Sequence, residues 1–343
     1  MKPVTYRFTG FNTKTVNEIA SVIAQALKPF RFSRFLLGCT FQNPLSDEAK
    51  LLLKKEFQPV LVRAVEKALG AKADFEKPEV EMLVNFNQDL VFFSIKPVFI
   101  CGRYKKFSRE ITQTVHYCYA CKGRGCSKCG YTGVLTKDSV QSLVEKHALL
   151  LFGASGAKFH GAGREDKDVR MLGSGRKFVL ELLEPLKRRA GLKRLEREIN
   201  RAEKEKIEVR NLKYCSKDDV VAIKAEKSDK LYEARVVCSK RVKKEQLSLL
   251  LGRELLVEQR TPNRVKGRRA DLVRERLARI KRVEWLSDKE FVLRVRAESG
   301  LYIKELVSGD AGRTKPSISS LLENECECRE LDVLRIIARK AKP

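Results

Sequence analysis

The sequence predicts an α+β protein with two domains, or three, arranged around a cysteine-rich segment. A length of 343 residues exceeds one ordinary domain, and a hydrophobic content of 43% supplies material for packed cores. Short apolar runs typical of strands are interspersed with apolar residues at helical spacing. In residues 116–133 this periodicity gives way to cysteines and small residues. We therefore expect an α+β domain over 1–105, a zinc knuckle and linker over 106–138, and a mixed-sheet α+β domain over 139–343.

The elements of the first domain follow from apolar spacing. Alternating polarity or short apolar runs predict strands over 4–9, 35–41, 80–86 and 90–100. Between the first two strands, apolar residues recur at helical spacing up to Leu27. A capping box of Thr15 and Glu18 is expected to begin this helix, and Pro29 to end it. A longer helix is predicted over 47–69, and Pro59 is expected to kink or divide it.

The second domain is predicted to alternate helices with short strands. Helical spacing indicates one helix over 139–151 and, after a glycine-rich stretch, a highly charged helix whose apolar stripe runs from Leu192 to Ala202. The other predicted elements are strands over 178–183, 207–209, 220–225, 234–238 and 291–297 and short helices over 244–250 and 304–307.

The charge of the chain indicates an anionic partner. Lys and Arg number 71 against 44 Asp and Glu, a net charge of +27. Residues 1–100 carry 14 basic and 10 acidic side chains, and the other 243 residues carry 57 and 34. Adaptation to heat would raise both signs and does not explain this excess in the downstream part. A nucleic acid or a membrane surface would be attracted by such a field.

Other features of composition exclude several classes of protein. No apolar stretch approaches the roughly 18 residues of a spanning helix, and the N-terminus lacks the apolar core of a signal peptide. Ten cysteines in a chain of this length do not fit the disulfide scaffold of a small secreted domain. We therefore expect a cytoplasmic protein with reduced thiols that does not enter a membrane.

Four of the cysteines have the spacing of a metal site. Cys118 and Cys121 form one CxxC turn, Cys126 and Cys129 form another, and four residues separate the two. Two such turns supply the four thiolates of a closed tetrahedral zinc site, which leaves no position open for water. The neighbouring glycines permit turns in which backbone amides face sulfur. We predict a structural zinc ion; His116 is a reserve ligand, and four unliganded thiols are the alternative.

A charged, glycine-flanked loop is the candidate for chemistry. From Arg164 to Arg170, six of seven residues are charged, and apolar residues flank the run. The loop lacks the GxxxxGK[ST] of a nucleotide P-loop and the dinucleotide fingerprint. It brings two carboxylates, Asp166 and Asp168, among several cations. A guanidinium nearby keeps a carboxylate ionised, and an ionised Asp in a basic cleft can act as nucleophile or base. A surface turn with paired charges is the alternative.

The residues from Gly163 to Gly173, GREDKDVRMLG, resemble the catalytic segment of the archaeal and eukaryotic tRNA pseudouridine synthases of the Pus-ten type. In the wider pseudouridine synthases this motif is G-R-x-D, and Asp166 has the position of its catalytic aspartate. Glu165, in place of the Thr of the bacterial-type motif, and Val169-Arg170 favour this branch.

Further segments match the same family in order. Lys230-Leu231-Tyr232-Glu233-Ala234 is similar to the second motif, and residues 301–306 with 309–316 are similar to the third. The resemblance implies that Tyr232 lies against the target base, that Ile303 packs under the site, that Lys304 pairs with the catalytic Asp, and that Leu331 is a further apolar position. The segments 259–265 and 268–272 resemble a basic RNA-contacting region. The substrate-binding residues that follow from the resemblance are Arg164, Arg170, Tyr302, Arg260, Arg264, Arg268 and Arg269.

The resemblance implies a fold and an activity. The expected fold is a mixed-sheet pseudouridine-synthase catalytic domain, preceded by a small THUMP-like RNA-binding domain that resembles the family more loosely. The expected activity is isomerisation of uridine to pseudouridine in the T-arm of tRNA, at position 54, 55 or both. It implies tRNA as partner, structural zinc, no organic cofactor and a monomer. The alternatives are a non-catalytic zinc-containing RNA-binding adaptor or chaperone and a zinc-knuckle translation or ribosome-assembly factor.

Overall fold

The computed structural model describes residues 2–41 and 45–338, and the side chain of Arg268 lies outside the described part. Within these residues the strands form a five-stranded and a ten-stranded sheet. The chain divides into two compact units. Unit 1 comprises residues 1–100, 145–158 and 180–195, and unit 2 comprises residues 101–144, 159–179 and 196–343. The α+β class with mixed sheets is confirmed. None of the described helices has the length and apolar character that a membrane span requires.

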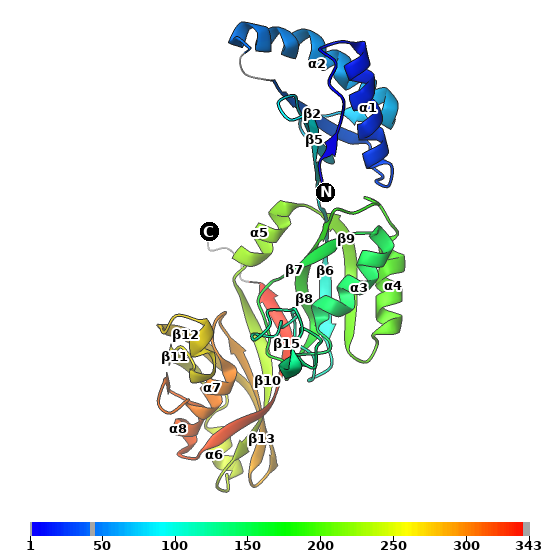
Figure 1. Ribbon diagram of the computed structural model, residues 1–343. Helices are drawn as coiled ribbons and strands as arrows, with labels where there is room; N and C mark the ends of the chain where they lie inside the picture. Colours follow the sequence, from blue (N-terminus) through cyan, green and yellow to red (C-terminus); the bar gives the residue numbers. More distant parts are fainter. Residues whose placement is uncertain (1, 42–44, 339–343) are drawn as a thin grey trace. The chain divides into compact units, whose positions relative to one another are not determined.

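The N-terminal part of unit 1 is a sheet covered by two helices that pack on each other (Figure 1). The strand order is β1-β5-β4-β2-β3, with β2 parallel to β3 and β4, and the other pairs antiparallel. The rings of Phe8, Phe11, Phe41, Phe57 and Phe86 meet edge to face or stacked in the core between helices and sheet. The elements are β1 (Val4–Thr5), α1 (Thr13–Leu27), β2 (Arg34–Thr40), α2 (Asp47–Leu69), β3 (Lys72–Ala73), β4 (Val80–Asn85) and β5 (Leu90–Ile95).

Two predictions on these helices are refined by the structure. Asn12, not Thr15, is the N-cap of α1: its side chain accepts the amide of Thr15, whose own hydroxyl accepts the amide of Thr9. The helix therefore begins two residues before the proposed capping box. The helix α2 is continuous over its whole predicted length with Pro59 inside it, and Ser46 caps its first turn.

The larger sheet has the strand order β14-β11-β12-β13-β10-β15-β8-β6-β9, and β7 pairs with β8 off this path. Along the sheet, β15 pairs antiparallel with β10 and parallel with β8, so these strands form its centre. Its strands are β6 (Val98–Lys106), β7 (Gly156–Gly161), β8 (Val169–Leu183), β9 (Ile207–Cys215), β10 (Ser228–Cys238), β11 (Glu254–Arg260), β12 (Val273–Ser287), β13 (Glu290–Ala297), β14 (Thr314–Lys315) and β15 (Cys326–Ala338).

Short helices accompany this sheet (Figure 1). They are η1 (Ser127–Cys129), α3 (Val140–Phe152), α4 (Leu192–Ala202), α5 (Lys217–Ala225), α6 (Lys244–Ser248), η2 (Asn263–Arg268), α7 (Ile303–Ser308) and α8 (Ile318–Leu322).

One predicted strand is wrong. Residues 220–225 belong to the helix α5, which Ser216 and Asp219 begin with a reciprocal capping box. The paired β-branched residues Val220 and Val221 suggested a strand, but the cap upstream of them decides the local structure. The predicted strand over 90–100 is two strands, because the chain breaks off pairing at Lys96-Pro97. The apolar pattern predicted only the end of β8, over 178–183. It did not predict the strands β3, β7, β11, β12, β14 and β15.

Candidate active site and metal centre

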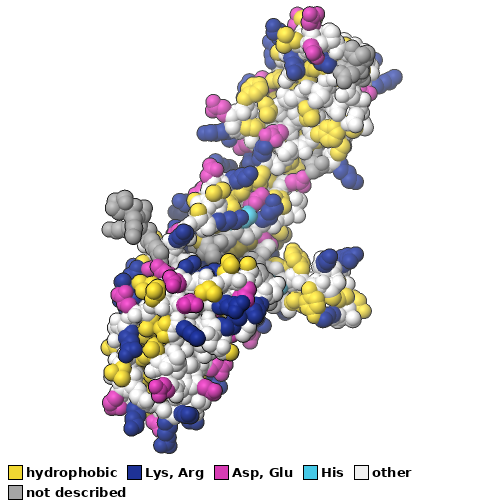
Figure 2. All heavy atoms as spheres, turned by 90° about the vertical axis from the view of Figure 1, so that its left-hand side faces the viewer, with side chains coloured by type: hydrophobic (Ala, Val, Ile, Leu, Met, Phe, Trp, Pro, Cys, Tyr) yellow, Lys and Arg dark blue, Asp and Glu magenta, His cyan; other side chains and the backbone are white. Residues whose placement is uncertain are grey.

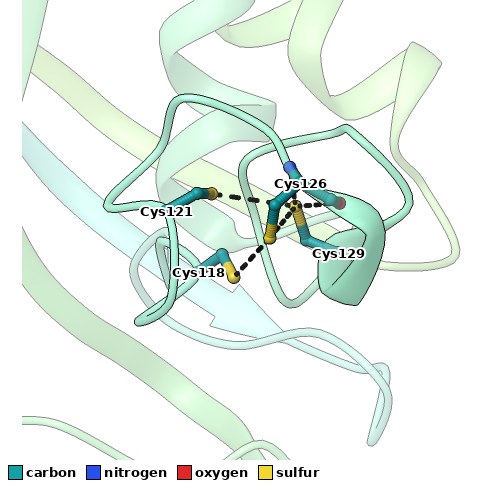
Figure 3. Close-up of side chains that lie close together, drawn as sticks. All are labelled: Cys118, Cys121, Cys126 and Cys129. Carbon is teal, nitrogen blue, oxygen red and sulfur yellow. Dashed lines mark hydrogen bonds between the residues drawn. The ribbon is translucent and has the colours of Figure 1, made fainter.

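The four predicted metal ligands meet in one place. In the knuckle loop, which we define as residues 116–135, the sulfur atoms of Cys118, Cys121, Cys126 and Cys129 all lie within 4.8 Å of one another and point toward a common centre (Figure 3). The Sγ–Sγ distances are 3.9 Å for Cys118–Cys126 and Cys121–Cys129, and 3.8 Å for Cys126–Cys129. Tetrahedral sulfur ligands about 2.3 Å from zinc are separated by about 3.8 Å. The cluster therefore has the dimensions of a metal site.

Backbone donors support the sulfur atoms as the glycine positions predicted. The amide of Gly125 donates to Cys121 Sγ at 3.2 Å, and that of Gly133 donates to Cys129 Sγ at 3.3 Å. Both glycines have positive φ, and a Cβ on Gly133 would lie 2.3 Å from the carbonyl oxygen of Gly123. His116 does not join the cluster; its Nε2 contacts Arg164.

The candidate catalytic loop, residues 163–168, directly precedes β8, which is one of the central strands of the larger sheet. Parallel pairing sets Val169 opposite Leu331 of β15, and antiparallel pairing sets Tyr232 of β10 opposite Val333 of the same strand. Residues from three sequence-distant segments are thus brought to one edge of the loop. Gly163 begins the loop with φ of +87°, and a Cβ there would lie 2.7 Å from the guanidinium of Arg176.

A buried ion pair anchors the loop from below. Arg176 Nε lies 2.8 Å from Glu165 Oε2, and each side chain is 1% exposed. The contact is an ion pair, since Arg176 Nε makes no hydrogen bond, whereas Nη1 of the same guanidinium donates to the carbonyl of Ala162 at 2.8 Å. The hydroxyl of Tyr104, from β6, donates to Glu165 at 2.7 Å and accepts from Gln113. The loop is therefore held by charge-assisted bonds to fixed strands, which orients the residues that follow Glu165.

A second set of donors holds the far end of the loop. The ammonium of Lys106 is buried and donates to the carbonyl oxygens of Lys167, Ser108 and Ile111 at 2.6 to 3.1 Å. Burial lowers its pKa to about 8, against the opposing effect of nearby carboxylates. Arg109 donates to the carbonyl oxygens of Asp168 and Leu331, and so joins the loop to β15.

Most predicted site residues line a single cavity of about 110 Å³. An apolar floor, a tyrosine ring and charged groups meet there. The predicted residues that line it are Asp166, Tyr232, Lys304, Ile303, Leu331, Arg164, Arg264 and Tyr302. Ile303 and Leu331 are buried, as expected for the base of the site. Burial raises the pKa of Tyr232 to about 12, with Arg176 opposing the shift, so its hydroxyl keeps its proton.

The two carboxylates of the loop have different cationic partners from those predicted. Lys304 Nζ lies 2.6 Å from Asp168 Oδ2, not on Asp166. Arg264 Nη1 lies 2.7 Å from Asp166 Oδ2, while its Nε lies 2.5 Å from Glu305. Burial would raise the pKa of Asp168, but the hydrogen bond and charge of Lys304 outweigh burial and lower it. The expected pairing fails because the loop turns between the two carboxylates, and Arg264 of η2 covers Asp166.

Three predicted arginines lie elsewhere. Arg170 binds the buried carboxylate of Asp332 through two nitrogens, and Arg260 pairs with Asp271 at 3.0 Å. Neither lines the cavity. Arg269 lines a neighbouring groove, and the side chain of Arg268 lies outside the described residues.

The neighbouring groove, of about 580 Å³, continues from the cavity and shares Tyr232, Tyr302 and Arg164 with it. Its charged lining residues are one carboxylate, Glu298, and the six cations Arg164, Lys227, Lys230, Arg269, Arg274 and Arg276. Figure 2 shows Asp and Glu interspersed among Lys and Arg over the face that it presents. The groove is therefore suited to a polyanion that enters the cavity.

Several of these residues were not predicted from the sequence. Tyr104, Lys106 and Gln113 precede the loop by about 50 residues or more, and no local pattern links them to it. Arg274 and Arg276 had a usable signal, since basic residues at alternating positions of a strand share one face.

Comparisons with known proteins identify the family of the chain. Residues 99–337 match the family model described as "Pus10, C-terminal". Three curated relatives bear the name tRNA pseudouridine synthase Pus10. That of Methanothrix thermoacetophila is 40% identical over 94% of this chain and 74% of the relative. That of Methanocaldococcus jannaschii is 39% identical over 95% of this chain and 73% of the relative. That of Archaeoglobus fulgidus is 39% identical over 94% of this chain and 92% of the relative. The chain thus belongs to the Pus10 family of pseudouridine synthases, as the resemblance predicted.

Proposed function

We propose that the chain isomerises uridine to pseudouridine in tRNA, the activity that the names of its relatives state. The observation that best supports this activity is the position of Asp166. It lines a cavity together with Tyr232 and an apolar floor, and a cationic groove lies beside that cavity. In this reaction the N1–C1′ bond breaks, the uracil turns, a C5–C1′ bond forms, and the proton of C5 is lost while N1 gains one. The carboxylate of Asp166 acts on the ribose, either by attack at C1′ or by removal of the C2′ proton.

The roles of the other residues follow from their contacts. The target nucleotide must leave its stack, which costs a few kcal/mol, and the ring of Tyr232 offers it a surface inside the cavity. Ile303 and Leu331 supply the apolar floor. Arg264 pairs with the carboxylate of Asp166 and orients it. Lys304 lowers the pKa of Asp168 and so steadies the loop.

The cationic groove beside the cavity supplies the binding surface for tRNA. We assign phosphate binding to the groove lined by Arg164, Arg269, Arg274 and Arg276, because backbone contacts by cations dominate affinity for nucleic acids. We propose the T-arm, at position 54, 55 or both, as the target. The proposed domains are a THUMP-like accessory domain over 1–105, the knuckle region over 106–138 and the catalytic domain over 139–343, acting as a cytoplasmic monomer.

We propose that the four cysteines of the knuckle loop hold a structural zinc ion. The spacing of their sulfur atoms and the amides that donate to them support this. Four thiolates close the coordination sphere, so the ion stabilises the loop and takes no part in the isomerisation. The reaction requires no organic cofactor.

The test is to incubate the protein with an unmodified tRNA transcript and to map pseudouridine by chemical derivatisation. We expect modification in the T-arm. Transcripts in which U54, U55 or both are replaced by cytidine identify the position. If unmodified transcript accumulates no pseudouridine at any position, the proposed activity is wrong; if it accumulates elsewhere, the proposed target is wrong.

A further inference from the structure

The knuckle loop carries an unusual set of exposed rings. Tyr117, Tyr119 and Tyr131 are 64%, 66% and 78% exposed, although the loop has a metal-site cluster at its centre. The four cysteines form the centre of the loop, and the three rings lie on its outside.

The local geometry holds these rings in place and leaves surface free. A Cβ on Gly123 would lie 3.2 Å from the ring of Tyr117, so this ring packs on the glycine backbone with one side. The ammonium of Lys128 lies 4.3 Å from the ring centroid of Tyr119 and covers one of its faces. The backbone amide of Tyr131 donates to the carbonyl of Cys126 at 2.9 Å, which fixes the backbone that carries the third ring.

The charge around the rings has one sign. Residues 111–137 contain no Asp or Glu, and contain the basic residues Lys122, Arg124, Lys128 and Lys137. Exposed aromatic rings interleaved with cations are the features that bind unpaired nucleotides: bases stack on the rings while the cations contact phosphates. An apolar protein partner would not need this excess of cations.

The knuckle loop is also joined to the candidate active site. His116, at its start, contacts Arg164, which lines both the catalytic cavity and the cationic groove. Gln113, three residues earlier, donates to the carbonyl of Gly163 at 2.8 Å. RNA that occupies the groove therefore passes an element connected directly to the knuckle loop.

We propose that Tyr117, Tyr119 and Tyr131 form a stacking surface for unpaired bases of the RNA substrate. The ion proposed for the four cysteines holds the loop, and the tyrosines, with Lys122, Arg124 and Lys128, bind single-stranded nucleotides outside the catalytic cavity. This deepens the proposed function, on which it rests for the identity of the RNA.

The test uses the full-length, zinc-loaded protein and measures the affinity for RNA by fluorescence anisotropy. The probes are a tRNA transcript, a single-stranded oligonucleotide and a fully paired hairpin stem. Replacing the three tyrosines together by Leu removes the π faces and keeps apolar side chains, whereas replacement by Phe keeps stacking. Trp285→Leu is the matched control, because Trp285 is an exposed aromatic residue outside the knuckle loop and the ammonium of Lys244 lies 4.6 Å from its ring centroid.

We expect the triple Leu variant to bind tRNA and the single strand about fivefold or more weakly, because stacking contributes roughly 1–3 kcal/mol per base. The triple Phe variant and Trp285→Leu should bind tRNA and the single strand as wild type does. The affinity of every variant for the paired stem should equal that of wild type. Zinc content, measured for every variant, checks that the loop is intact. Unchanged affinity of a zinc-loaded Leu variant for both probes would overturn the proposal and leave the rings to a protein partner.

A measurement on the wild-type protein does not depend on the folding of a variant. Tetranitromethane nitrates exposed tyrosines, and mass spectrometry identifies them. We expect the three tyrosines to be protected by saturating single-stranded RNA and not by the paired stem; equal nitration with and without RNA contradicts the proposal. Both tests are independent of turnover. Protection of the tyrosines without pseudouridine formation supports the stacking surface and refutes the proposed activity. Pseudouridine formation without protection supports the proposed activity and refutes the stacking surface.

Discussion

Removal of the guanidinium of Arg176 should destabilise unit 2 more than any surface change. In Arg176→Met, the carboxylate of Glu165 loses its ion partner at 2.8 Å while it stays 1% exposed, and only the hydroxyl of Tyr104 still donates to it. The carbonyl of Ala162 also loses its donor. Breaking a buried pair from one side costs about 3–5 kcal/mol, because an uncompensated charge remains. Methionine fills the volume, so the loss is electrostatic.

The assay is urea unfolding followed by fluorescence. The chain has a single tryptophan, Trp285, which lies in β12 of unit 2 and reports on that unit. With a slope of about 3 kcal/mol per molar urea, a loss of this size moves the midpoint down by about 1 to 2 M. Glu165→Gln alone should also lower it. The double variant should be more stable than the sum of the two changes predicts, because it buries no unpaired charge.

The reasoning is refuted if both single variants unfold within about 0.2 M of wild type, or if their effects add. Either result would mean that the pair does not hold the loop. A further consequence concerns catalysis: in conditions where Arg176→Met is still folded, the loop that carries Asp166 loses its anchor, so turnover should fall while binding of tRNA changes little.

Three more predictions concern other parts of the chain. Cys126→Ser should lower the zinc content below the expected one ion per chain and destabilise the knuckle loop, whereas wild-type protein without zinc by elemental analysis contradicts the assignment. Neutralising Arg264, Arg268 and Arg269 together should weaken tRNA binding and flatten its dependence on salt, and an unchanged slope removes this segment from the interface. Burial lowers the pKa of Lys106 from 10.5 to about 8, so the unfolded chain binds its proton more tightly. Relative to Lys106→Met, wild type should therefore gain stability as pH rises from 8 to 10.5, and a constant difference in unfolding free energy would contradict the shift.

Local signals in the sequence predicted the residues of the site better than they predicted which side chains pair with them. The loop from Gly163 to Gly173 and the two CxxC turns are continuous motifs, and both have the geometry that the spacing indicates. The bounds of helix α2 agree with the predicted range 47–69, although Pro59 lies inside the helix.

Features that depend on distant residues were predicted poorly. Whether Lys304 pairs with Asp166 or Asp168 depends on how the loop turns and on the approach of Arg264, nearly 100 residues downstream. The ion-pair partner of Glu165 could likewise not be predicted from the sequence, although the sequence shows that Glu165 replaces the Thr of the commoner motif. The structure accounts for the departure: Glu165 is the buried partner of Arg176, which the Thr of the commoner motif could not be.

The most direct measurement of the central claim compares Asp166→Asn with Asp168→Asn in pseudouridine formation on a tRNA transcript, with binding measured in parallel. An amide keeps the size of the side chain but cannot attack C1′ or accept a proton at the ribose. We predict that Asp166→Asn binds tRNA and forms no pseudouridine, and that Asp168→Asn, which loses its pairing with Lys304, retains part of the activity. If Asp166→Asn forms pseudouridine at a near-normal rate, this carboxylate is not the catalytic group.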